Sequence, residues 1–245
     1  MSAEPDMIPG IYNYCDRWCE RCAYTSRCLQ YQIESEEDQS GEALRDFDAL
    51  NAQFWQDMGE ALVHAMRLIR ELAEREGIKP EDIEKETLFS EHGVSLHHTA
   101  REHPCAHAAL LYSGMVNDWF AAHNDYSGAE ESLLTSPPQV LEEHFQVIRH
   151  YQYFIYPKIV RAIEGRMAYP VSAHQDSPQN DASGTAKISL IVIDRSLAAW
   201  SVLYGEYPVY EDKTLSILVH LDRLRRSIEV VFPSARAFIR PGFDA

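Results

Sequence analysis

The sequence predicts an all-α protein: a four- to five-helix bundle with an N-terminal cysteine-rich metal-binding cap. Apolar residues recur every three or four positions over long stretches between residues 42 and 232, as in helices with one buried face. Four of the five cysteines lie within residues 15–28, whereas free cysteine usually occurs singly as a small buried apolar residue. We therefore divide the chain into a cysteine-rich metal-binding segment, residues 1–35, and a helical bundle, residues 36–245.

The helical pattern defines the elements of the bundle in order. Helices are expected at residues 42–77, 104–125, 138–164, 185–204 and 212–232. Prolines open the second and third helices, because the first turn of a helix tolerates proline, and Pro157 should kink the third. The fourth helix is apolar almost all round and should be central. The acidic stretch 34–42 is expected to be a linker or a frayed helix start, and residues 78–103 and 165–184 to be connections.

Composition narrows the class of protein. The net charge of −16 should repel nucleic acid and anionic membrane surfaces, so nucleic-acid binding is not expected. No stretch approaches the roughly 20 apolar residues of a membrane span, and the acidic N-terminus has no signal-peptide pattern. We expect a cytoplasmic protein with no membrane partner. A protein partner or homodimer is expected if one chain cannot bury every apolar helix face.

The candidate metal ligands are Cys15, Cys19, Cys22 and Cys28, in the spacing C-x3-C-x2-C-x5-C. In a reducing compartment, clustered thiols indicate metal binding or catalysis more than disulfides. An iron–sulfur cluster ([4Fe-4S]) accepts such compact, uneven spacing. Zn²⁺ also takes four thiolates, although two separated C-x2-C pairs are its usual pattern. Redox chemistry at the Cys19–Cys22 dithiol is the third alternative, and a structural role is expected before a chemical one.

Two family resemblances involve these cysteines. The spacing from Cys15 to Cys22 resembles the signature of radical S-adenosylmethionine enzymes, but the strand–helix repeats of that family are absent from the predicted elements. The segment from Cys19 to Cys28, which includes Tyr24, resembles the cluster segment of RecB-type nucleases. That resemblance implies a four-iron cluster, with Cys15 as the remaining ligand. It covers ten residues and implies no nuclease activity, because the strand-borne acidic residues of the nuclease core are missing.

Polar residues beside the apolar stripes suggest a possible second site. The candidates on the helices are Asp57, Glu60, His64, His123, His144 and His220. If the helices alternate in direction, three of the histidines should lie in the same third of the bundle and form a metal or acid–base site. The simpler interpretation is that each is a hydrogen-bonded core histidine. No predicted helix carries the Glu-x-x-His of a ferritin-like di-iron bundle, and catalytic residues stay unassigned. The alternative function is therefore a redox or metal-dependent enzyme with an atypical site inside the bundle.

A histidine-rich stretch, residues 92–107, lies between the first two predicted helices. It contains five of the eleven histidines and could bind a transition metal. We favour a solvated loop whose last residues cap the helix that Pro104 opens.

Overall fold

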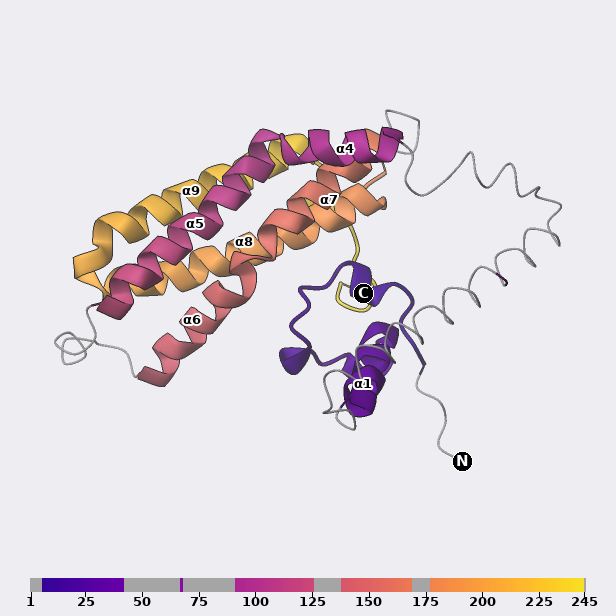
Figure 1. Ribbon diagram of the computed structural model, residues 1–245, viewed down its shortest axis with the longest axis horizontal. Helices are drawn as coiled ribbons and strands as arrows, with labels where there is room; N and C mark the ends of the chain where they lie inside the picture. Colours follow the sequence, from indigo (N-terminus) through magenta and orange to yellow (C-terminus); the bar gives the residue numbers. More distant parts are fainter. Residues whose placement is uncertain (1–5, 42–66, 68–90, 126–137, 169–176, 245) are drawn as a thin grey trace, which may run out of the picture. The chain divides into compact units, whose positions relative to one another are not determined.

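The computed structural model describes residues 6–41, 67, 91–125, 138–168 and 177–244. Within these ranges the chain is all-helical, without a strand (Figure 1), which confirms the predicted class. The chain divides into two compact units: residues 1–27 together with 96–245, and residues 28–95. The division predicted from the sequence, at residue 35, stays a prediction.

The second unit is described mainly through helix α1 (Leu29–Gly41). This helix begins directly after Cys28, whose carbonyl accepts a hydrogen bond from the backbone N–H of Gln32 (3.2 Å). Most of the acidic stretch 34–42 is therefore the C-terminal part of α1, and the prediction of a linker or a frayed helix start is wrong for residues 34–41. The predicted helix 42–77 lies outside the described residues except for Arg67, and so do three of the candidate polar residues: Asp57, Glu60 and His64.

The first unit is built from six helices in its described residues. They are α4 (Glu91–Arg101, in this unit from Leu96 on), α5 (Pro104–Asp125), α6 (Pro138–Gln152), α7 (Ile155–Ala168), α8 (Asp181–Glu206) and α9 (Glu211–Val231). Helix α8 packs against α6, α7 and α9, and α5 lies alongside α9 (Figure 1). The predicted central position of the fourth helix is confirmed.

Helix ends are set by local chemistry. His103 precedes Pro104, and its Nδ1 accepts a hydrogen bond from the backbone N–H of Cys105 (3.1 Å), so it caps α5 as predicted. Asn180 caps α8 through Ser183 N–H (2.8 Å), which begins that helix four residues before the predicted start. The stretch that precedes His103 is helix α4 and not a loop.

The predicted third helix is two helices. Helix α6 ends at Gln152 and α7 begins at Ile155, so the chain breaks ahead of Pro157. Pro157 then lies in the first turn of α7, where its missing N–H costs no helical hydrogen bond. The prediction of a kink was right, but its position was displaced by one turn.

Two tryptophans lie at the centre of the core. Trp119 of α5 and Trp200 of α8 are fully buried, with ring centroids 5.2 Å apart. The indole N–H of Trp119 donates to Thr214 Oγ1 (2.9 Å), and that of Trp200 donates to the Tyr112 hydroxyl (3.1 Å). Burial raises the pKa of Tyr112 to about 12. These bonds fix the orientation of both rings, because an unpaired buried N–H would destabilise the fold.

Helix α8 passes, by length and hydropathy alone, as a segment that could cross a membrane. Half of the apolar stretch is buried inside the unit, against α6, α7 and α9. The core helix of a soluble protein has the same properties, so this feature is weak evidence of a membrane span.

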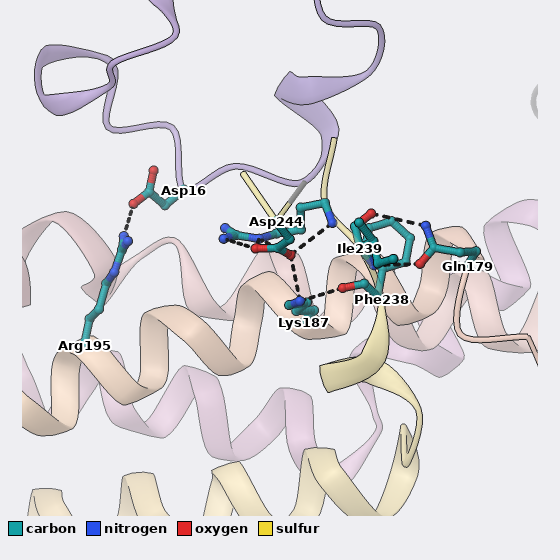
Figure 2. Close-up of polar contacts among 8 residues, drawn as sticks. Asp16, Gln179, Lys187, Arg195, Phe238, Ile239 and Asp244 are labelled. Atoms are coloured by element: carbon teal, nitrogen blue, oxygen red, sulfur yellow. Dashed lines mark hydrogen bonds and ion pairs between the residues drawn. The ribbon is translucent and has the colours of Figure 1, made fainter. Parts of the chain in front are cut away.

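The C-terminal tail (residues 232–244) is fixed to α8 by an ion cluster (Figure 2). Lys187 Nζ donates to the Phe238 carbonyl (2.5 Å) and pairs with the Asp244 carboxylate (2.7 Å), which also accepts from Arg240 (2.8 Å). The hydrogen bonds from Arg240 hold the pKa of Asp244 well below its usual range. The side chains of Lys187, Asp244 and Arg240 are only 16%, 22% and 13% exposed. The cluster is therefore partly desolvated, which strengthens its ion pairs.

A second contact holds the tail through its backbone. The carboxamide of Gln179 accepts from the backbone N–H of Ile239 (2.6 Å) and donates to the carbonyl of the same residue (3.2 Å) (Figure 2). One side chain thus satisfies both backbone groups of Ile239, as a neighbouring strand would.

Candidate functional site

Residues 6–27, called here the N-terminal segment, carry three of the four clustered cysteines. The segment contains three single-turn 3₁₀-helices, Ile11–Asn13, Cys19–Arg21 and Thr25–Arg27. Arg17 has a φ of 56°, in the left-handed region that non-glycine residues seldom adopt. Ile11 is the only fully buried side chain among these residues. The segment has almost no core of its own and depends on contacts with the helices.

Aromatic stacking supplies the first of these contacts. The ring of Trp18 stacks on His150 of α6 (4.3 Å between centroids) and meets the edge of Tyr151 (5.7 Å). The guanidinium of Arg21 lies 4.1 Å from the centre of the Trp18 ring and donates to Gln146 Oε1 (2.7 Å). Trp18 therefore packs the segment against the bundle.

Asp16 is held by three polar groups of the helices. Its carboxylate accepts from Arg195 of α8 (Figure 2). It also accepts from the Tyr151 hydroxyl (2.8 Å), to which Arg195 donates as well (2.7 Å). His150 Nε2 lies 3.0 Å from the Asp16 carbonyl. Burial opposes ionisation of Asp16, but Tyr151 and Arg195 outweigh it and lower the pKa of the carboxyl. Burial and the neighbouring Asp16 raise the pKa of Tyr151.

Two tyrosines join the N-terminal segment to α8 and the tail. The ring of Tyr14 packs on Phe238 (4.6 Å), and its hydroxyl donates to Asp181 (3.0 Å). Burial, with Asp181 beside the hydroxyl, raises the pKa of Tyr14 to about 12. Tyr24 meets Phe243 edge-on (5.1 Å).

A glycine makes the approach of Tyr14 possible. A Cβ atom on Gly184 of α8 would lie 2.5 Å from the Tyr14 ring and 2.7 Å from the Phe238 ring. The segment and the tail therefore meet where α8 has no side chain.

The four predicted metal ligands are thiols, which are the ligands of both zinc sites and iron–sulfur clusters. Cys15, Cys19, Cys22 and Cys28 are half-buried, and none of them is in a disulfide. Cys22 Sγ accepts from the backbone N–H of Tyr24 (3.4 Å), a bond of the kind that tunes metal-bound sulfur. The Cys15 thiol donates to the Tyr12 carbonyl (3.5 Å), and burial raises its pKa.

Across the described parts of the chain, no three His, Cys, Asp or Glu side chains are arranged to hold a metal ion. Cys28 belongs to the second unit, whereas the other three ligands belong to the first. The four-cysteine site therefore stays a prediction.

A cavity of about 540 Å³ lies between the N-terminal segment, α6, α8 and the tail. Its charged lining residues are Asp16, Arg21 and Arg195, and its aromatic ones are Trp18, Tyr24, Tyr151 and Phe243. Val147 and Ala199 supply apolar wall, while Cys22 and His144 also face the cavity. This combination of apolar walls and a few polar groups is typical of a small-molecule site.

The three described candidate histidines do not converge. His220 Nε2 lies 2.7 Å from the Ala108 carbonyl near the start of α5, whereas His123 stacks on Trp119 near its end (5.1 Å between centroids). Ala108 and His123 are about 22 Å apart along that helix. His144 faces the cavity. The expected grouping is wrong, because antiparallel packing places the start of α9, not its middle, beside the end of α5.

The residues that do build the site were not singled out by their sequence pattern. His150, Tyr151, Arg195 and Phe243 come from three separate parts of the chain and meet only in the folded unit. One signal was available: His150 projects away from the apolar arc of its helix, so a polar partner was to be expected there.

Comparisons of this chain with protein-family models, with curated proteins and with solved structures found no match.

Proposed function

We propose that this chain is a cytoplasmic metal-binding protein in which Cys15, Cys19, Cys22 and Cys28 hold one [4Fe-4S] cluster or one Zn²⁺. The observation that carries the proposal is that the segment buries only Ile11, while none of the four clustered cysteines is in a disulfide. Small segments without a core are commonly stabilised by a disulfide or a structural metal. Free cysteines fit a reducing compartment, which favours the metal.

The role that fits this placement is structural. A bound metal would stabilise the backbone that presents Asp16 and Trp18 to α6 and α8, and so would fix one wall of the cavity. Because ligands are seldom preformed around an absent metal, binding free energy would appear as folding free energy of the segment. A cluster would add the capacity to accept or donate an electron.

The test is anaerobic purification followed by an absorbance spectrum and elemental analysis of iron, zinc and acid-labile sulfide. We expect about four irons with sulfide per chain, or about one zinc without colour. Cys19→Ser should lose most of the metal, and hydrogen exchange of residues 6–27 should rise. Cys105→Ala is the control, because Cys105 is buried in the core and is outside the cysteine run in sequence. Metal-free protein after anaerobic reconstitution, or equal metal in Cys19→Ser, would overturn the proposal.

A further inference from the structure

We infer that the cavity beside the N-terminal segment binds a small aromatic carboxylate, and that Arg21 receives the carboxylate group. The volume of about 540 Å³ is in the range of small-molecule sites. The aromatic rings of Tyr24, Tyr151 and Phe243 and the side chain of Val147 line the cavity. A flat apolar ligand would be largely removed from water between them.

The charge of the lining selects an anion. Two guanidinium groups, Arg21 and Arg195, face the cavity with one carboxylate, Asp16, so the formal sum is +2 − 1 = +1. This sum is opposite in sign to the net charge of the whole chain, −16. Arg195 is already paired with Asp16. A single remaining positive charge suits a monoanion better than a phosphate dianion.

Arg21 is placed to receive that anion. Its described partners are neutral: the Trp18 ring, 4.1 Å away, and Gln146 Oε1, at 2.7 Å. A guanidinium carries five N–H donors, so these contacts leave donors for a carboxylate. Because the side chain is already held in place, less conformational entropy is lost when a ligand binds.

The same cavity already holds one carboxylate. Asp16 is bound by a guanidinium and a phenol hydroxyl, Arg195 and Tyr151, which are strong partners for a carboxylate. This internal pair occupies Arg195 and leaves Arg21 for the ligand. None of these contacts uses a thiol, although Cys22 lines the same cavity and the proposed metal would fix one of its walls.

Calorimetric titration of the native protein with 1-naphthoate, and with the uncharged 1-naphthamide, tests the inference. We expect saturable binding of the carboxylate, at least about tenfold tighter than the amide. Arg21→Gln should abolish that preference. Ala198→Leu should weaken both ligands, because Ala198 is an exposed residue of the lining and a larger side chain would fill the cavity without disturbing the core.

Arg149→Gln is the matched control. Its guanidinium also lies over an aromatic ring, that of Phe120 at 4.6 Å, but outside the cavity lining. It should bind 1-naphthoate like the native protein. Equal affinity for the acid and the amide, no binding at about 1 mM, or equal losses in both arginine variants would overturn the inference. The metal content of the same samples is measured as well. Failure of the ligand to bind can then be distinguished from failure of the cysteines to bind a metal.

Discussion

The helices of the first unit and the N-terminal segment are stabilised by different interactions. Each helix from α5 to α9 buries several side chains completely, and Trp119 and Trp200 alone contribute two of the largest. Residues 6–27 bury Ile11 and otherwise use stacking, an ion pair and hydrogen bonds to the helices. Apolar burial stabilises without regard to direction, whereas the contacts of the segment each require one geometry.

This difference indicates how the two regions should respond to perturbation. Loss of a core side chain should lower the stability of the whole unit, because the buried residues form one continuous cluster. Loss of a contact of the segment should free residues 6–27 and leave the helices folded. A metal bound by the cysteines would reduce this difference in stability between the N-terminal segment and the helices.

The strongest test compares two tryptophans. Trp119→Ala should lower the global free energy of unfolding by about 3–5 kcal/mol, because it leaves a cavity in the core. Trp18→Ala should lower it by no more than about 1 kcal/mol, while hydrogen exchange of residues 6–27 rises sharply. Chemical denaturation and native-state hydrogen exchange measure both effects. Equal losses of unfolding free energy in the two variants would show that the segment and the helices unfold as one cooperative unit. That result would contradict the difference described above.

A second test uses pH at the ion cluster of the tail. Hydrogen bonds from Arg240, with Lys187 nearby, lower the pKa of Asp244 in the folded state. The contribution of this carboxylate to stability is therefore complete above its unfolded pKa of about 3.9 and is lost as the pH falls below that value. We expect exchange of the amides in residues 235–244 to rise below about pH 4 before the helices lose ellipticity.

The variant Asp244→Asn checks the assignment. It should weaken attachment of the tail by about 1.5–3 kcal/mol at neutral pH and remove the acid dependence. Asp118→Asn, at an exposed position on α5, is the control and should change neither. If the rise in exchange at acid pH persists in Asp244→Asn, another carboxylate is responsible for it.

The third and smallest test uses two helical glycines. Gly184→Ala should destabilise the junction of segment and tail by about 1–3 kcal/mol, since its Cβ would overlap Tyr14 and Phe238. Gly114→Ala, where nothing lies within 4 Å of the new Cβ, should stabilise α5 by about 0.5–1 kcal/mol. Thermal melts give the sign of each change. A neutral Gly184→Ala would mean that the two rings move aside at no cost, and that the junction is loose.

Most helices of the described chain could be predicted because their signals are local. Pro104 and the apolar periodicity fix α5, and the same periodicity fixes α9 to within a residue. Helix α4 was missed because its stabilising contacts are not local. Ala100 is fully buried, and His97 lies 3.4 Å from Glu164 of α7.

The candidate site could be predicted only in part, for the same reason. The cysteine run identifies the N-terminal segment from the sequence. His150, which stacks on Trp18, is 132 residues from it in sequence (150 − 18), and Arg195, which pairs with Asp16, is 179 residues from that partner. No periodicity or spacing links such distant positions, so the cavity that Trp18 and Arg195 line appears only in the folded chain.

The contact between Gln179 and Ile239 has a consequence for how the tail tolerates sequence change. Gln179 recognises the main chain at position 239, while the Ile239 side chain is 55% exposed. Evolution is therefore expected to accept almost any side chain there except proline, which lacks the N–H that Gln179 requires. Inserting or deleting one residue between 232 and 239 should be selected against, because it would shift the main-chain groups out of reach of the carboxamide. The tail is constrained in length more than in composition.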